Sequence, residues 1–144
     1  MAEIGLAASI VAVIQIATAV TKQAYKYGQC VKNATKDIEK IDSQLKDVEN
    51  ILTKLKDLAD RATQSGKPLD KWPTLVSLNS ADGPLAQCRL ALILLRDELA
   101  PVGGFAKYAE RALWPRKKKR VEKCLDDIEK QKKIFIESLN LEHM

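Results

Sequence analysis

The sequence predicts an all-α fold, a helical bundle of four long helices plus one or two short helices. Ala, Leu, Lys, Glu, Asp and Ile dominate the composition, and most of these residues favour helices. Apolar residues recur at three- and four-residue steps along several segments, and no segment indicates a β-sheet. A chain of 144 residues is long enough for one domain with a real core, so we expect residues 1–144 to form a single domain.

The first predicted helix lies within residues 1–28; it starts at about Glu3 and stops at Gly28. From Ile4 to Thr21 no side chain is charged, whereas 30% of the whole chain is charged. As a helix, this stretch would be about 27 Å long, close to the hydrocarbon thickness of a bilayer. A helix that is apolar nearly all round is either a central helix wrapped by its neighbours or a membrane helix. We expect it to be buried among the other three helices at rest, because an exposed apolar stripe of this size would aggregate.

The second and third long helices are predicted over residues 35–63 and 85–99. A break at Ser65-Gly66-Lys67-Pro68 and a short helix from Trp72-Pro73 to Leu78 separate them. Asp82-Gly83-Pro84 supplies an N-cap with Pro in the first turn of the third long helix. The inward stripes are Ile38, Ile41, Leu45, Val48, Ile51, Leu52, Leu55, Leu58 and Ala62, then Leu85, Cys88, Leu92, Leu95 and Leu99.

The last long helix is predicted over residues 116–140. A brief helix from Phe105 to Leu113 precedes it, and Trp114-Pro115 separates the two. The inward face of the last helix is Val121, Cys124, Leu125, Ile128, Phe135 and Leu139. Four long amphipathic helices with short connections are typical of a bundle.

The cysteines and the start of the chain both indicate an intracellular, reducing compartment. The 3 cysteines are widely spaced and form no CxxC pair. A signal peptide is the alternative for residues 1–21, with Ala17-Thr18-Ala19 as a cleavage-like site, but Glu3 gives its start the wrong charge. We expect Cys88 and Cys124 to be small core side chains, because they lie among apolar residues at helical spacing.

The sequence offers no catalytic arrangement. The single histidine is His143, which removes Ser-His-Asp and Cys-His pairings in their ordinary form. No Cys/His cluster has zinc spacing, and no phosphate-binding Gly-rich loop or EF-hand pattern occurs. Acid pairs such as Asp126-Asp127 lie among lysines and are interpreted as solvated charges. We therefore expect no enzyme, no cofactor and no metal.

The positive charge is concentrated in one segment. Lys107 to Lys123 contains eight basic and two acidic residues, a net charge of +6 against +5 for the whole chain. Such a patch suits anionic lipid or nucleic acid. No interleaved aromatic residues or DNA-binding motif accompany it, which disfavours nucleic acid. A solvated run and a nuclear-import-like cluster remain as alternatives.

The centre of this segment, Arg116 to Arg120, consists of five consecutive cations that cannot share one helical face. Near the start of a helix they would oppose its dipole, so helix stability does not explain them. Near an anionic membrane each could gain about 1 kcal/mol, and the neighbouring Trp114 suits an interfacial position.

Four segments in this order are MAEIGLAASIV (residues 1–11), DGPLAQC (82–88), LWPRKKKRV (113–121) and IEKQKKIF (128–135). Together they resemble the HeLo-like N-terminal domain of fungal STAND (NLR-like) proteins. The resemblance implies a four-helix-bundle effector of regulated, necrotic cell death in fungal innate immunity and heterokaryon incompatibility. The architecture is similar to the helical bundle of the mixed-lineage kinase-like necroptosis executioner and to the coiled-coil domains of plant helper immune receptors.

The resemblance also implies partners and a mechanism. Such a domain is cytoplasmic at rest; activation assembles several copies, and the N-terminal helix attacks the plasma membrane, with pore formation or leakage as the result. The expected partners are anionic membrane lipids, further copies of the chain, and an NLR-like or amyloid signalling module. The sequence holds no such module, so we expect an excised domain or a partner-dependent short form. A non-lytic helical adaptor of an NLR-like receptor is the alternative function.

By position, the resemblance assigns two sets of site residues. The first would insert into the membrane and is Ile4, Leu6, Ile10, Val11, Val13, Ile14, Ile16 and Val20. The second would contact anionic lipid and is Arg116, Lys117, Lys118, Lys119, Arg120 and Lys123.

Overall fold

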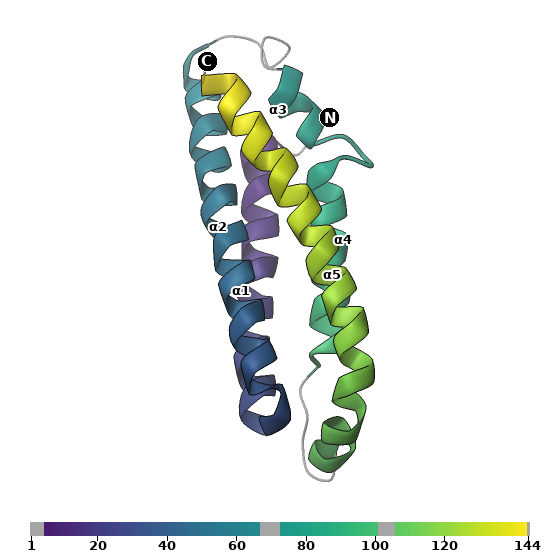
Figure 1. The fold of residues 1–144 in the computed structure, drawn as a ribbon. Helices are drawn as coiled ribbons and strands as arrows, with labels where there is room; N and C mark the ends of the chain where they lie inside the picture. The colour runs from purple at the N-terminus through teal and green to yellow at the C-terminus, as the bar shows by residue number, and fades with distance from the viewer. Residues whose placement is uncertain (1–4, 67–72, 101–105, 144) are drawn as a thin grey trace.

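The computed structural model describes residues 5–66, 73–100 and 106–143, which form an all-α bundle with no strand among them (Figure 1). The predicted fold class is confirmed: four long helices are accompanied by one short helix and a 3₁₀ turn. The elements are α1 (Leu6–Cys30), η1 (Lys32–Ala34), α2 (Thr35–Gln64), α3 (Pro73–Leu78), α4 (Pro84–Glu98) and α5 (Ala106–His143).

The four long helices alternate in direction. In Figure 1, α1 and α4 descend, whereas α2 and α5 ascend, and both chain termini lie at the upper end. α1 packs against α2 and α4, and α5 packs against the same two helices, so α1 and α5 occupy opposite corners. We call the lower end the basal end and define it as residues 26–40, 96–100 and 109–120. The opposite end, where α1 begins and α5 finishes, is the apical end.

The predicted ranges 35–63 and 85–99 are confirmed to within one residue at each end, and so is the short helix ending at Leu78. Their apolar stripes are buried, with Ile51 only half-buried. Cys88 and Cys124 are buried as predicted, and burial raises the pKa of Cys88 to about 12. The side chain of Asp82 forms no N-cap hydrogen bond; Gly83 is the N-cap residue, with Pro84 in the first turn.

The prediction that α1 is wrapped by the other three helices is wrong. One face of α1 is buried: Leu6, Ile10, Val13, Ala17, Val20, Ala24 and Tyr27. The opposite face is exposed because a helix at a corner of the bundle packs along its length on two long neighbours, α2 and α4, and meets α5 at its basal end through Tyr27. Small or uncharged side chains tolerate this exposure without strong cost. They are Ala8, Ala12, Gln15, Thr18 and Ala19.

The prediction that Gly28 stops the first helix is also wrong, because α1 continues to Cys30. Gly28 faces α2: a Cβ atom at this position would lie 3.1 Å from Cγ2 of Ile38. The glycine therefore lets α1 and α2 approach closely before the chain turns. The predicted start at Glu3 lies outside the described residues.

The predicted break at Trp114-Pro115 is absent, and α5 runs without interruption from Ala106 to His143. Proline has no N–H group, so Pro115 cannot donate to the carbonyl of Arg111 one turn earlier. Nδ2 of Asn33, in η1, donates to that carbonyl instead, at 3.1 Å. This bond and the packing of Trp114 explain why the two helices predicted over 105–113 and 116–140 are one helix from Ala106 onward. The predicted start at Phe105 lies outside the described residues.

Candidate functional site

The predicted insertion residues lie mostly on the covered face of α1. Leu6, Ile10, Val13 and Val20 are buried, and Ile4 lies outside the described residues. The remaining three residues, Val11, Ile14 and Ile16, are half-buried at the edges of the exposed face. By length and composition α1 could cross a membrane, and only 28% of its most apolar 18-residue window is buried in the bundle. Core helices of soluble proteins have the same length and composition, so this property does not place α1 in lipid.

The six predicted lipid cations divide into two groups of three. Lys117, Lys118 and Arg120 form ion pairs with acidic residues of α5, α2 and α4, respectively. Arg116, Lys119 and Lys123 are exposed and form no ion pair within the described part of the chain. These three are spaced by three and four residues, so they share the outer face of α5. All six lie inside α5 rather than at its start, so the argument from the helix dipole does not apply to them.

The innermost ion pair joins Lys117 to Glu110, seven residues earlier on the same helix. Nζ of Lys117 lies 2.8 Å from Oε1 of Glu110, and the two side chains are 15% and 16% exposed. The same ammonium group donates to the carbonyl of Glu98 at 3.1 Å, at the last residue of α4. The pair spans Pro115 and joins both sides of the proline to the end of α4.

Two further ion pairs join α5 to its neighbours. Nζ of Lys118 lies 3.2 Å from Oδ1 of Asp37 in the first turn of α2. Nε of Arg120 donates to Oε1 of Glu98 at 2.7 Å. These cations therefore have a role within the fold, in addition to any contact with a ligand.

Trp114 does not lie at the surface, so its predicted interfacial position is wrong. Its side chain is 2% exposed, and its indole Nε1 donates to Oδ2 of Asp37 at 2.9 Å. Its ring packs against Tyr27 with centroids 5.5 Å apart and planes at 48°. Trp114 thus joins α5 to both α1 and α2.

Tyr27 is the point at which α1 meets this network. Its hydroxyl donates to Oε2 of Glu110 at 2.6 Å, and Nζ of Lys117 lies 5.6 Å from its ring centroid. Burial, and secondarily the carboxylate of Glu110, raises the pKa of Tyr27 far above its ordinary value. Burial alone would raise the pKa of Glu110, but hydrogen bonds from Lys117 and Tyr27 outweigh it and lower that pKa.

One turn earlier, Gln23 joins α1 to the end of α4. Its Nε2 donates to the carbonyls of Arg96 and Leu99, both at 2.7 Å. The carbonyl of Arg96 also accepts the backbone N–H of Leu99 at 3.2 Å, whereas the carbonyl of Leu99, the C-cap residue, lies past the end of the helix. Gln23 therefore adds a donor at a helix end, where carbonyls run short of partners within the helix. We define the basal clasp as the residues of this polar network: Gln23, Tyr27, Asn33, Asp37, Glu98, Glu110, Trp114, Lys117, Lys118 and Arg120.

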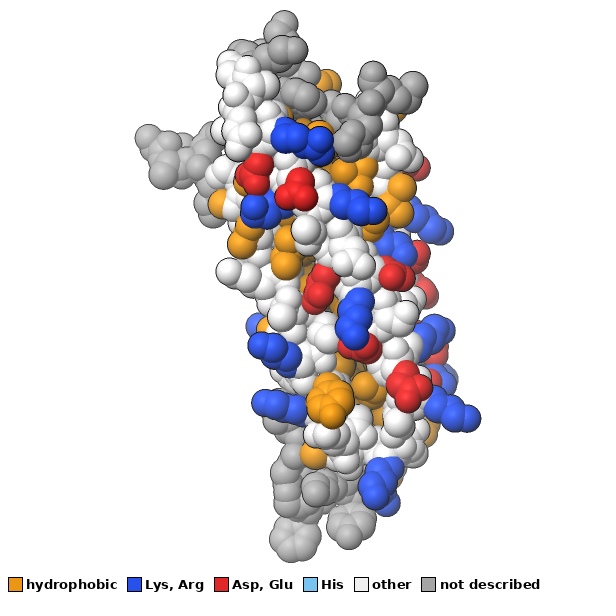
Figure 2. Space-filling model, turned by 90° about the vertical axis from the view of Figure 1, so that its left-hand side faces the viewer, with side chains coloured by type: hydrophobic (Ala, Val, Ile, Leu, Met, Phe, Trp, Pro, Cys, Tyr) orange, Lys and Arg blue, Asp and Glu red, His pale blue; other side chains and the backbone are white. Residues whose placement is uncertain are grey.

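The fold gathers charge at the basal end from segments that are far apart in the sequence. Residues 26–40, 96–100 and 109–120 contain eleven basic and five acidic residues, a net charge of +6, which leaves −1 for the rest of the chain. The end of α1, η1, the start of α2 and the start of α5 all contribute (Figure 1). On the side of α2 shown in Figure 2, basic and acidic side chains are interspersed instead, as in the ion pairs Lys46–Asp42 and Lys56–Asp60.

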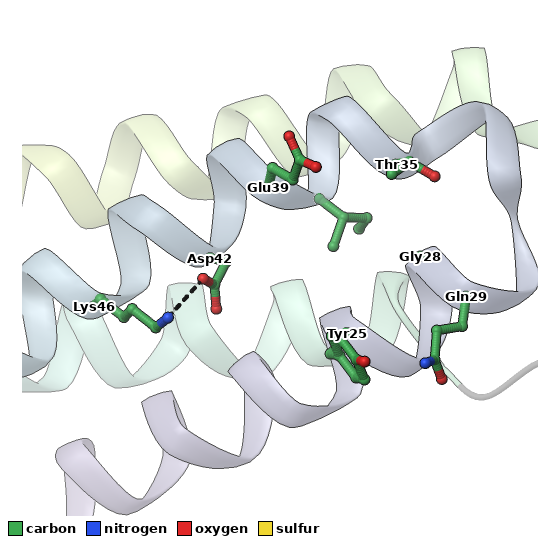
Figure 3. A pocket seen from close by; sticks show the side chains of 8 residues that line it. Tyr25, Gly28, Gln29, Thr35, Glu39, Asp42 and Lys46 are labelled. Carbon is green, nitrogen blue, oxygen red and sulfur yellow. Dashed lines mark ion pairs between the residues drawn. The ribbon is translucent and has the colours of Figure 1, made fainter.

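A groove of about 430 Å³ lies between the end of α1 and the start of α2 (Figure 3). Ile38 and Gly28 line it together with Tyr25, whose side chain is 66% exposed. Glu39 also lines it, and Asp42 does so while paired with Lys46 at 2.9 Å. Among the described residues, no group of three or more His, Cys, Asp or Glu side chains could hold a metal ion.

Sequence reasoning missed the acidic and aromatic partners of the basic segment. Asp37 and Glu98 are distant from it in sequence, and nothing in their local pattern indicates an ion pair. The pair Glu110–Lys117 was within reach, because a seven-residue spacing places both side chains on one helical face. That inference required α5 to continue through Pro115.

Comparison of the chain with protein-family models, curated proteins and solved structures gives no match.

Proposed function

We propose that this chain is a membrane-targeting effector domain of regulated necrotic cell death that acts by self-association and insertion of α1. The resemblance to HeLo-like domains suggests fungal NLR-like signalling as its setting, with a cytoplasmic resting state and the plasma membrane as the target. The observation that carries the proposal is the position of α1. This helix has the length and composition to cross a membrane, and its part Leu6–Thr21 already exposes an uncharged face at a corner of the bundle. The exposed Lys22 and Lys26 follow that part.

Transfer of α1 into lipid does not expose its backbone polar groups, because the helix keeps its own backbone hydrogen bonds. The buried face, with Ile10 and Val13 at its centre, makes apolar contacts that hydrocarbon can replace. The exposed face carries small or uncharged polar side chains such as Ala12 and Gln15, and a bilayer tolerates these better than charges. Several copies of a helix of this length could line a lesion together.

The exposed cations would bring the domain to an anionic surface. Arg116, Lys119 and Lys123 are free to contact phosphate, at about 1 kcal/mol each near such a surface. Together they would raise the affinity for an anionic membrane by on the order of 100-fold over a neutral one. The set proposed for the first lipid contact is therefore narrower than the six residues expected from the sequence.

The test is a charge placed on the exposed face of α1. Ala12→Glu should leave the bundle folded, because the position is exposed, and should abolish leakage of phosphatidylserine vesicles. A carboxylate inside a bilayer costs about 3 kcal/mol, enough to suppress insertion by on the order of 100-fold. Ser43→Glu on the exposed side of α2 is the matched control and should leak like the parent. Equal leakage by both variants would overturn insertion of α1.

A non-lytic adaptor is the second candidate, and an apolar patch on α4 favours it. Leu90 and Leu94 lie one turn apart, and both are about half exposed. Replacing both with Ser should abolish binding of a protein partner if the domain is an adaptor. Vesicle leakage that survives this change and is lost in Ala12→Glu would favour the membrane effector instead.

A further inference from the structure

We infer that the basal clasp retains α1 in the bundle and that anionic phosphates compete with its acidic residues for Lys118 and Arg120, so that membrane binding and release of α1 are coupled. The inference rests on the proposed function and adds its regulation. It assigns the cations of one segment to two tasks. Arg116, Lys119 and Lys123 make the first contact with a membrane, whereas Lys117, Lys118 and Arg120 hold the resting structure together.

The first argument is the distribution of bonds along α1. Within the described residues, no side-chain hydrogen bond or ion pair joins Leu6–Val20 to another helix. From Thr21 onward the helix is joined to α4 through Gln23 and to α5 through Tyr27. Apolar contacts can be exchanged for lipid, but a lost hydrogen bond to a buried partner costs free energy. The basal part of α1 therefore resists release.

The second argument is the accessibility of the clasp cations. The side chains of Lys118 and Arg120 are 42% and 61% exposed although both are ion-paired. Each is adjacent in sequence to Lys119, which faces outward. A phosphate held by Lys119 would thus lie near cations whose internal bonds are already open to water. Exposed pairs of this kind are weak, so a second anion can compete for them.

The third argument is the connection from these cations to α1. Asp37 forms an ion pair with Lys118 and accepts a hydrogen bond from the indole of Trp114, and Trp114 packs on Tyr27. Glu98 pairs with Arg120, and its carbonyl accepts a bond from Lys117. If a phosphate draws Lys118 or Arg120 away, the carboxylate of Asp37 or Glu98, respectively, loses its cation. The contacts of Tyr27 with the base of α5 would loosen as a result.

The test uses the two variants that break one ion pair from opposite sides, Glu110→Gln and Lys117→Gln. Both should speed amide hydrogen exchange in Thr21–Cys30 by about tenfold or more in solution, because both open the clasp. Only Glu110→Gln raises the net charge, so only this variant should bind phosphatidylserine vesicles more tightly than the parent. Arg120→Gln breaks a more exposed ion pair, so it carries less risk to folding. It should also speed amide hydrogen exchange in Thr21–Cys30.

Matched controls change the same charges away from the clasp. Glu137→Gln and Lys133→Gln are exposed sites in the apical part of α5. They should leave exchange in Thr21–Cys30 unchanged. If the clasp variants exchange no faster than these controls, the clasp does not retain α1 and the inference is wrong.

The coupling itself is tested on the parent chain with vesicles. Phosphatidylserine vesicles should speed exchange in Thr21–Cys30, whereas phosphatidylcholine vesicles should not. Binding to phosphatidylserine with unchanged exchange in this segment would overturn the coupling. If the parent binds neither vesicle, both the proposed function and the coupling fail. Amide exchange in Glu110→Gln and Lys117→Gln still decides whether the clasp retains α1.

Discussion

The two parts of α1 are held in the bundle by different kinds of interaction. Leu6–Val20 contributes apolar side chains that pack on α2 and α4, and the buried ones are Leu6, Ile10, Val13, Ala17 and Val20. Thr21–Cys30 contributes Gln23 and Tyr27, which bond to specific atoms of α4 and α5. The apical part, Leu6–Val20, is therefore held by apolar burial. The basal part, Thr21–Cys30, is held in addition by hydrogen bonds to specific atoms.

Because of this difference, the contacts that stabilise α1 in the bundle are largely distinct from the contacts that could regulate its release. Each fully buried aliphatic side chain contributes about 1.5–3 kcal/mol, and any apolar surroundings would supply the same term. A bilayer could therefore take over the apical contacts of α1. The basal hydrogen bonds require particular partners, such as Glu110 for Tyr27. A signal that acts on these partners can release the helix without weakening its apolar face.

The largest expected effect is that of a charge on the buried face of the apical part. Ile10 is 0% exposed, so Ile10→Glu buries a carboxylate among aliphatic side chains and should destabilise the bundle by at least about 4 kcal/mol. Urea unfolding followed by circular dichroism measures this change. The exposed Ala12→Glu should stay within about 0.5 kcal/mol of the parent. Similar losses in both variants would contradict the one-sided burial of α1.

A smaller effect is expected at the clasp, and it should depend on pH. Glu110→Gln leaves Lys117 without its carboxylate and should cost about 2 kcal/mol at neutral pH, less than for a fully buried pair. The pKa of Glu110 is lowered from its ordinary value of 4.5, so its contribution is complete above that value and is lost as pH falls through the lower, folded-state pKa. The difference in unfolding free energy between parent and variant should therefore shrink below pH 4.5.

The same comparison with Glu137→Gln supplies the control for this prediction. Glu137 is exposed and forms no ion pair within the described residues, so its replacement should change stability by less than about 0.5 kcal/mol. A difference between parent and Glu110→Gln that stayed constant down to pH 3 would show that the ion pair contributes nothing to stability.

The fold was predictable because its dominant signal is local. The stripes of α2 and α4 repeat at helical spacing, and long amphipathic helices with short connections leave few arrangements other than a bundle. The one-sided burial of α1 was not predictable in this way. The larger apolar side chains of this helix, such as Ile10 and Val13, already mark the face that is buried. The opposite face carries no charge between Ile4 and Thr21, so the sequence does not show that this face is left uncovered.

The candidate site was less predictable because its bonds join distant segments. Arg116 to Arg120 were recognisable as a basic run, but the pairing of Lys118 with Asp37 and of Arg120 with Glu98 depends on tertiary structure. By local rules alone, Pro115 favours a break in the helix, and Trp114 beside a basic run favours a position at a membrane interface. The fold overrides those rules because Asp37 accepts the indole N–H and Asn33 replaces the missing backbone donor.

The smallest expected effect tests whether Asn33 supplies the hydrogen bond that Pro115 cannot donate. Asn33→Ala removes the donor to the Arg111 carbonyl, and because this bond is exposed the cost should be about 0.5 kcal/mol. Pro115→Ala restores a backbone N–H that can donate to the same carbonyl within the helix. Asn33→Ala should therefore cost nothing measurable in the Pro115→Ala background. Unfolding free energies of the parent, the two single variants and the double variant measure this coupling, and strictly additive values would show that Asn33 does not compensate for the proline.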